Sequence, residues 1–281
     1  MDKILKKFLK KNKEKEKRFN LALIQKLKKK EINISFSQNF EDLIIKRLFP
    51  KYKSFYYVDV GANSPIINSN TMLFYLNGAK GINIDAQEKV VEELNLFRKK
   101  DKNILALIHS SVDFVDFNYH KIPSRSSSDK RFIKLSKIGL NKSGSEINIV
   151  RKKTITLTEI LKRNNCPKVF NFLNIDVEGS EYNVLLGLNL KIYKPRLIIV
   201  ETAPPYDLKK SLSKKFRNDE KYIDEYLKKF SYVKLYKDVV NTWYCKKSSY
   251  LSFKKKIYLP TTKIIDNFIT FSHYQSLINI K

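Results

Sequence analysis

The amino-acid sequence predicts an α/β fold, in which helices cover both faces of a mainly parallel sheet. Short continuous apolar segments recur along the 281 residues, as in strands that are buried on both faces. Amphipathic segments with apolar residues at helical spacing separate them. Acidic residues stand at the ends of three apolar segments, and ligands of open parallel sheets bind beyond such strand ends.

Five apolar segments are predicted to form the parallel strands. They cover residues 55–60, 81–84, 103–109, 169–175 and 197–200. The first, second and fourth end at or next to Asp59, Asp85 and Asp176. Residues 232–236 and 241–245 are predicted to form a closing pair of strands.

Amphipathic helices are predicted between the strands. They cover residues 38–49, 68–76, 87–100, 157–163, 182–188 and 222–230. In the third of these, Val90 and Leu94 share one face with other apolar residues. Ser37 is placed to cap the first helix, and Pro50 ends it.

Residues 111–154 interrupt the alternation of strands and helices. The segment 112–119 alternates like an exposed strand, and residues 123–129 form a Ser-rich loop that contains Arg125. A further strand is predicted at 149–155. We interpret residues 111–154 as an insertion that lies over the site.

The net charge is +28, from 56 Lys and Arg against 28 Asp and Glu. Residues 1–31 carry +9 and residues 246–281 carry +6, so over half of the excess lies near the two ends. Such an excess favours an anionic partner. We expect a basic helical N-terminal extension at 1–35 and a basic C-terminal tail at 246–281. Attachment to an anionic membrane surface and a merely solvated helix both fit the extension.

Other features exclude several classes of protein. Cys166 and Cys245 have neither disulfide nor metal-ligand spacing, which favours a reducing compartment. The histidines at 109, 120 and 273 form no local cluster, so no zinc site is predicted. Apolar runs are too short for a signal peptide or a membrane span. We therefore expect a cytoplasmic protein that can be peripheral to the membrane.

The strand ends predict a cofactor that contains a nucleoside. Gly61 permits a tight turn after the first strand, and Asp85 after the second is placed to accept hydrogen bonds from ribose hydroxyls. The chain has no Gly-rich phosphate-binding motif, so we expect a cofactor without a pyrophosphate.

Six motifs follow one another along the chain: Phe36-Ser37-Gln38, Val58-Asp59-Val60-Gly61-Ala62-Asn63, Ser69-Asn70-Thr71, Gly81-Ile82-Asn83-Ile84-Asp85, Leu173-Asn174-Ile175-Asp176-Val177-Glu178-Gly179 and Ile199-Val200-Glu201. In this order they resemble the FkbM family of S-adenosylmethionine-dependent methyltransferases. The resemblance covers about residues 36–245, which we expect to form the methyltransferase domain. It implies a class I Rossmann-like fold with seven strands, of which the last is antiparallel.

The resemblance also implies the cofactor, S-adenosyl-L-methionine, and the residues around it. Asp59, Gly61 and Asn63 would line its methionine end, and Asp85 would hold its ribose. A residue near Ser110 or Ser111 would meet its adenine, and Asn70 would face the cofactor pocket as well.

Acidic residues at the ends of the fourth and fifth strands are the catalytic candidates. Asp176 is the first candidate, Glu201 the second, and Glu178 lies beside them. One of them can take a proton from an acceptor hydroxyl, or together they can bind a divalent cation that lowers its pKa. Ser180 is placed to cap the helix that follows, with Glu181 in its first turn, and His109 is a weaker candidate base.

These inferences predict an O-methyltransferase that acts on a hydroxyl of a sugar, glycan or natural product, with the 111–154 insertion as lid. The net charge suggests an RNA 2′-O-methyltransferase as an alternative. Such enzymes resemble one another in a Lys-Asp-Lys-Glu tetrad, however, and here the fifth strand ends in Glu201. A non-catalytic methyltransferase fold that tethers partners at a membrane surface is the third reading.

Overall fold

The computed structural model describes residues 33–50, 54–120, 123–131, 148–203, 210–257 and 268–270. The chain divides into two compact units: residues 55–63 and 80–255 form the larger, and residues 1–54, 64–79 and 256–281 form the smaller. Residues 1–32 of the basic helical extension expected at 1–35 lie outside the described residues, and so do residues 258–267 and 271–281 of the tail expected at 246–281.

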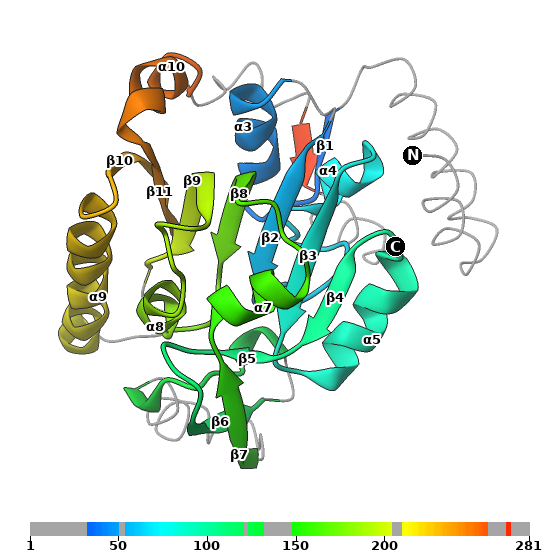
Figure 1. Cartoon of the computed structure of the whole chain (residues 1–281), viewed down its shortest axis with the longest axis vertical. Coiled ribbons are helices and arrows are strands. Elements are labelled where there is room, and N and C mark those ends of the chain that lie inside the picture. The colour runs from blue at the N-terminus through cyan, green and yellow to red at the C-terminus, as the bar shows by residue number, and fades with distance from the viewer. Residues whose placement is uncertain are drawn as a thin grey trace. The chain divides into compact units, whose positions relative to one another are not determined.

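A seven-stranded sheet forms the centre of the larger unit (Figure 1). Its spatial order is β10 (Tyr232–Lys237), β11 (Asn241–Lys246), β9 (Lys194–Glu201), β8 (Val169–Ile175), β2 (Tyr56–Val60), β3 (Lys80–Asp85) and β4 (Lys102–Leu105). Neighbours from β9 to β4 are parallel, whereas β11 is antiparallel to both β10 and β9. The predicted α/β fold, with a mainly parallel sheet and an antiparallel last strand, is confirmed.

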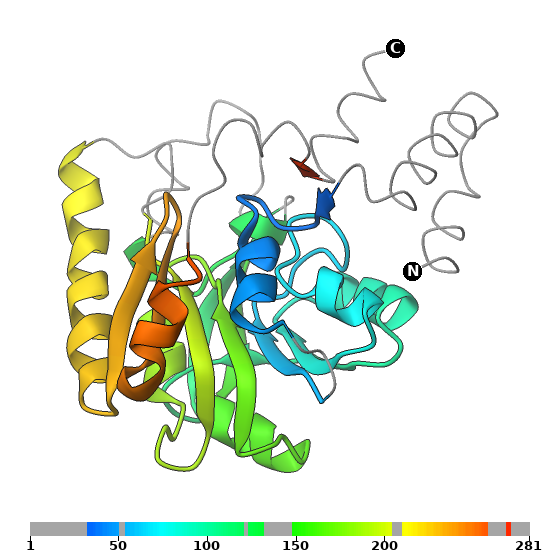
Figure 2. The same cartoon turned by 90° about the horizontal axis from the view of Figure 1, so that it is seen from above.

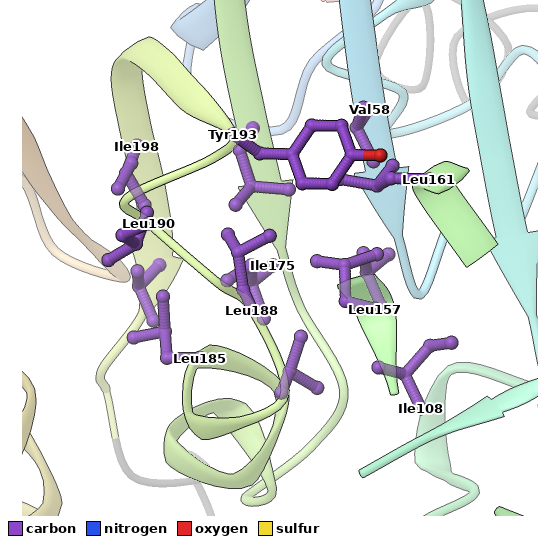
Figure 3. Close-up of a cluster of buried hydrophobic side chains, with 14 of the residues drawn as sticks. Val58, Ile108, Leu157, Leu161, Ile175, Leu185, Leu188, Leu190, Tyr193 and Ile198 are labelled. Carbon is purple, nitrogen blue, oxygen red and sulfur yellow. The ribbon is translucent and has the colours of Figure 1, made fainter. Parts of the chain in front are cut away.

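Three helices pack on one face of this sheet, namely α7 (Leu157–Arg163), α8 (Glu181–Leu186) and α9 (Lys210–Lys228). Figure 3 shows how Leu157 and Leu185 from two of these helices meet Val58 and Ile175 from the strands. Figure 2 shows α9 alongside β10 at the edge of the sheet. The side chains of Val58, Leu157, Ile175 and Leu185 are fully buried. Truncating one buried Leu to Ala in such a core lowers the free energy of unfolding by about 2–5 kcal/mol.

The opposite face carries a buried polar network next to α5 (Glu88–Phe97). Arg98 forms a 3.0 Å ion pair with Asp101, and both side chains are completely buried. The Tyr57 hydroxyl donates to Asp101 and accepts from Arg98, and the Gly81 amide donates to the second Asp101 oxygen. The network therefore joins β2, β3 and the chain after α5.

The predicted strand at 103–109 is wrong in its second half, because the chain leaves the sheet after β4. Residues Leu107–Ile108 form β5, which pairs with β7 (Asn148–Ile155), and β7 also pairs with β6 (Phe114–Tyr119). This three-stranded sheet lies beyond the carboxyl ends of the parallel strands (Figure 1). The predicted helix at 222–230 also differs, since α9 begins at Lys210.

The smaller unit contains β1 (Asn33–Ser35), α3 (Glu41–Leu48), α4 (Met72–Leu76) and β12 (Phe268–Thr270). Helix α3 begins at Glu41 with Phe40 at its N-cap position, so the prediction that Ser37 caps a helix starting at residue 38 is wrong; the Ser37 hydroxyl instead accepts a hydrogen bond from the Asp42 amide in the first turn. The Asp42 carboxylate accepts from the Ser35 hydroxyl and the Phe36 amide at 2.6 and 2.8 Å. These hydrogen bonds therefore hold the segment before α3 against the first turn of that helix.

None of the helices within the described ranges has both the length and the apolar character that a bilayer crossing requires.

Candidate active site

A cavity in the larger unit lies beyond the carboxyl ends of β2, β3, β4 and β8, where open parallel sheets bind ligands. Residues after these four strands and residues of the insertion line it. They are Val60, Gly61, Asn63, Ile84, Asp85, Ala86, Gln87, Ala106, Leu107, Ile108, Phe117, Pro123, Ser124, Ser126, Ser128, Asp176, Val177, Glu178 and Ser180. Five of the residues selected from the sequence therefore line the same cavity, namely Gly61, Asn63, Asp85, Asp176 and Glu178.

The turn after β2 requires glycine. Gly61 has φ +80°, and an added Cβ would lie 1.7 Å from the carbonyl oxygen of Asp176. The Gly61 amide donates to the Ile84 carbonyl at 2.9 Å. The ends of β2, β3 and β8 are therefore held in direct backbone contact at the floor of the cavity.

Asp85 lines the cavity at the end of β3, and the surrounding backbone holds its carboxylate. The Asn63 amide donates to one oxygen at 3.1 Å, and the Gln87 amide donates to the other at 2.9 Å. Burial raises the pKa of Asp85, while these hydrogen bonds and the charge of Lys152 act in the opposite direction. A carboxylate has about four lone-pair positions, so the two oxygens retain capacity for a ligand hydroxyl.

Asp176, Glu178 and Glu201 form an acidic cluster at the ends of β8 and β9. One carboxylate oxygen from each lies within 4.8 Å of the other two. Burial raises the pKa of all three, to about 9 for Glu178. Asp176 and Glu201 share a hydrogen bond, which acts against burial on the pKa of Asp176 and adds to the raised pKa of Glu201. This hydrogen bond therefore distinguishes Asp176 from Glu201 as the candidate proton acceptor.

The turn that follows Asp176 is organised by Glu181. Its carboxylate accepts from the Val177 amide at 3.1 Å and the Gly179 amide at 2.9 Å, and burial raises its pKa to about 7. Glu178 in this turn has φ +58°, the left-handed region that costs a residue with a Cβ about 1–2 kcal/mol. Glu181 therefore fixes the backbone that presents Asp176 and Glu178.

Residues of the insertion are fastened to the same turn. The Ser127 hydroxyl donates to the Glu178 carbonyl at 2.6 Å, and the Ser128 hydroxyl lies 2.9 Å from that of Ser180. Ser180 was predicted to cap α8 with its side chain, but it makes no such hydrogen bond and contacts Ser128 instead. The prediction for Ser180 is therefore wrong.

Arg131 extends this attachment to a distant helix. Its guanidinium bonds the Asp129 carboxylate, the Gly179 carbonyl and both oxygens of Asp219 on α9. The ion pair with Asp219 joins the loop of the insertion to α9, and the hydrogen bond to Gly179 joins it to the turn after β8.

Other predicted residues lie away from the cavity lining. Asp59 is buried in β2 and accepts a 2.9 Å hydrogen bond from Asn174. Ser111 is exposed, and its carbonyl accepts from Thr154. The Ser110 hydroxyl lies 3.2 Å from His109 Nδ1, and neither residue lines the cavity. Asn70 belongs to the smaller unit, and Glu201 joins the site through Asp176.

The structure adds residues that sequence reasoning did not select. Leu107, Ile108 and Phe117 give the cavity an apolar wall, which suits a heterocyclic base. The Gln87 side chain donates to the Pro123 carbonyl and accepts from the Ser126 hydroxyl, so it ties β3 to the insertion. The position of Gln87 two residues after Asp85 was an available signal, whereas Phe117 resembled any alternating strand residue.

These groups fit a nucleoside-containing cofactor: an apolar wall faces the base, and Asp85 offers an acceptor for ribose hydroxyls. The acidic cluster can serve as a proton acceptor, and its carboxylates are of the type that divalent cations prefer.

Comparison with known proteins identifies one family. The profile described as "Methyltransferase FkbM domain" matches residues 59–234, which is more than half of the chain. No curated protein shows a significant match to the chain.

Proposed function

Because the chain belongs to the family of FkbM methyltransferases, we propose that it transfers a methyl group from S-adenosylmethionine to a hydroxyl of a sugar, glycan or natural product. The observation that carries this proposal is the cavity at the carboxyl ends of four parallel strands, with the backbone-held carboxylate of Asp85 in its wall. Asp85 would accept hydrogen bonds from the ribose, and Phe117 and Ile108 would contact the adenine.

When bound, the cofactor supplies an electrophilic sulfonium methyl group. Transfer of this methyl group to the acceptor oxygen would break its carbon–sulfur bond and leave a neutral thioether. Asp176 would take the hydroxyl proton, because it accepts a hydrogen bond from Glu201 and is thereby favoured in its ionised form. The enclosing residues contribute by holding the reacting groups in line and excluding water.

The insertion supports a hydroxyl-bearing acceptor. Ser124, Ser126 and Ser128 line the cavity and can exchange hydrogen bonds with a polar molecule. Arg125 between them is half-buried, and its charge opposes the raised pKa of Glu178. The segment 111–154 would therefore act as the lid that selects the acceptor.

The basic ends support a location at an anionic surface in the cytoplasm. The segments 1–31 and 246–281 carry +9 and +6, and about 1 kcal/mol of attraction per Lys or Arg applies near anionic lipid. Sedimentation of the full chain with vesicles of phosphatidylserine, against vesicles of phosphatidylcholine, tests this part. Equal binding to both, or to neither, would contradict it.

Calorimetric titration with S-adenosylmethionine tests the cofactor site. Asp85→Asn and Asp85→Ala should weaken binding by about 10–100-fold, which corresponds to loss of a hydrogen bond to a charged group. Glu92→Gln, on the exposed side of α5, is the matched control and should bind like the wild type. Unchanged affinity in both Asp85 variants would refute the assignment of Asp85.

Transfer of labelled methyl from the cofactor to a panel of acceptors tests the reaction. Label should enter the hydroxyls of sugars or glycans and should be absent from RNA. Running the panel with EDTA and with added Mg²⁺ distinguishes a carboxylate base, whose rate EDTA leaves unchanged, from a cation held by the acidic cluster. Labelling of RNA 2′-hydroxyls in place of glycans would overturn the proposed acceptor.

A further inference from the structure

The side chain of Lys152 is more buried than those of its two neighbours on β7. Arg151 and Lys153 are exposed, whereas Lys152 is half-buried and contacts the loop after β3. Alternate residues of a strand point to opposite faces, so Lys152 lies on the face of the β6–β7 pair that carries Phe117.

The ammonium group of Lys152 has partners on two sides of the cavity. It donates to the Ala86 carbonyl at 2.5 Å and to the Tyr119 hydroxyl at 2.6 Å. It also lies 5.6 Å from the ring centroid of Phe117 and 5.0 Å from that of Tyr119, within the range of cation–π attraction. The two rings meet edge to face at 5.0 Å.

Two of these partners line the cavity, namely Ala86 beside Asp85, and Phe117 from the insertion. Lys152 thus joins the loop that carries the acidic residue to the strand that carries the aromatic wall. Around Asp85, the amides of Asn63, Ala86 and Gln87 donate to the carboxylate. Lys152 has the largest effect on Asp85 among charged side chains, and it favours the ionised form.

We propose that Lys152 is a positioning residue for the nucleoside part of the cofactor, holding Phe117 and the Asp85–Ala86 segment in the arrangement that the base and ribose require. This inference rests on the proposed function. Lys152 acts through Phe117 and Asp85 and need not touch the cofactor itself. It connects the insertion to cofactor binding in addition to the acceptor recognition proposed above.

The test is the dissociation constant of S-adenosylmethionine, measured between pH 5 and pH 9 on the full chain. Lys152→Met keeps the length of the side chain and removes its charge, Lys152→Arg keeps the charge, and Lys153→Met is the matched control on the opposite face. Thermal melting of each variant confirms folding.

Lys152→Met should raise the dissociation constant about tenfold at pH 7, equivalent to about 1.4 kcal/mol. It should also move the acid limit of binding to higher pH, because the pKa of Asp85 rises when the neighbouring cation is removed. Lys152→Arg should keep the acid limit of the wild type, and Lys153→Met should change neither quantity.

Wild-type affinity and an unmoved acid limit in folded Lys152→Met would overturn the role of Lys152 while leaving the proposed function intact. An equal loss in Lys152→Met and Lys153→Met at every pH would also overturn it, since that result indicates a general effect of lost charge. If the wild type itself fails to bind S-adenosylmethionine, the proposed function fails, and this inference fails with it.

Discussion

The carbonyl oxygen of Asp176 occupies the space that a side chain on Gly61 would need, only 1.7 Å from the position of an added Cβ. The turn that follows the first strand of the domain therefore touches the strand end that carries the candidate base. This backbone contact joins the proposed cofactor site to the proposed proton acceptor, with no side chain between them.

Gly61→Ala should lower the free energy of unfolding by about 2–5 kcal/mol, because left-handed strain and overlap with Asp176 add together. Gly78→Ala is the matched control. Gly78 also has a positive φ, +90°, but no atom lies within 4 Å of an added Cβ, so strain alone of about 1–2 kcal/mol applies. Urea unfolding measures both, and an equal loss in the two variants would contradict the overlap.

Asp176→Asn should lower kcat by about 10²–10⁴, the usual contribution of a positioned general base. Glu201→Gln should lower kcat less than about tenfold, since an amide can still donate the hydrogen bond that Glu201 gives to Asp176. Steady-state assays with the acceptor found in the panel measure both rates. A larger loss in Glu201→Gln than in Asp176→Asn would assign the proton acceptor to Glu201.

Glu178→Gln should flatten the dependence of stability on pH. Burial, with Asp176 and Glu181 nearby, raises the pKa of Glu178 from 4.5 to about 9. Between these values the folded protein holds a proton that the unfolded chain lacks, so the free energy of unfolding falls as pH rises through this window. The variant lacks the titrating group and should melt several degrees above the wild type at pH 9.

At pH 5 the difference between Glu178→Gln and the wild type should be small, because Glu178 is then protonated in the folded state. Melting curves from pH 5 to pH 9 provide the measurement, with the exposed Glu92→Gln as control. Parallel curves for Glu178→Gln and the wild type would show that Glu178 titrates as in the unfolded chain.

Arg131→Met should lower the free energy of unfolding by about 1–2 kcal/mol, because it removes several charged hydrogen bonds between the insertion, α9 and Gly179. The side chain of Arg131 is only 34% exposed. Arg163→Met removes an i,i+4 pair with Glu159 whose Arg is 63% exposed, and should cost at most about 0.5 kcal/mol. If urea unfolding shows equal losses of the free energy of unfolding in the two variants, the Arg131 network contributes no more to stability than the exposed Arg163 pair.

The fold was predictable wherever one local pattern determined an element. The helix at Leu157–Arg163 and the strand at Val169–Ile175 have the predicted boundaries, since their apolar period and flanking residues agree. Thr156 caps that helix by accepting a hydrogen bond from the Glu159 amide. The departure of the chain from the sheet after Leu105 was not predictable, because it depends on the pairing of Leu107 with Thr154 of β7, 47 positions away.

The site was predictable at the strand ends and not in the insertion. Asp85 and Asp176 line the cavity because parallel strands bring their carboxyl ends to one edge. Ser111 was expected near the adenine from its place after the third strand, yet the chain has turned away by that point. Phe117 and Lys152 are brought to the cavity only by the pairing of β6 with β7, and a lysine among so many basic residues carries no signal.

The pairing of β1 with β12 has a consequence for how the chain can be shortened. Asn33–Ser35 and Phe268–Thr270 run side by side in parallel, so residues about 235 positions apart complete the same small sheet. A deletion of residues 246–281, designed to remove a basic tail, would also take away the partner of β1 and the hydrogen bonds of its backbone. Removal of either strand therefore leaves the strand near the other end of the chain without its pairing partner.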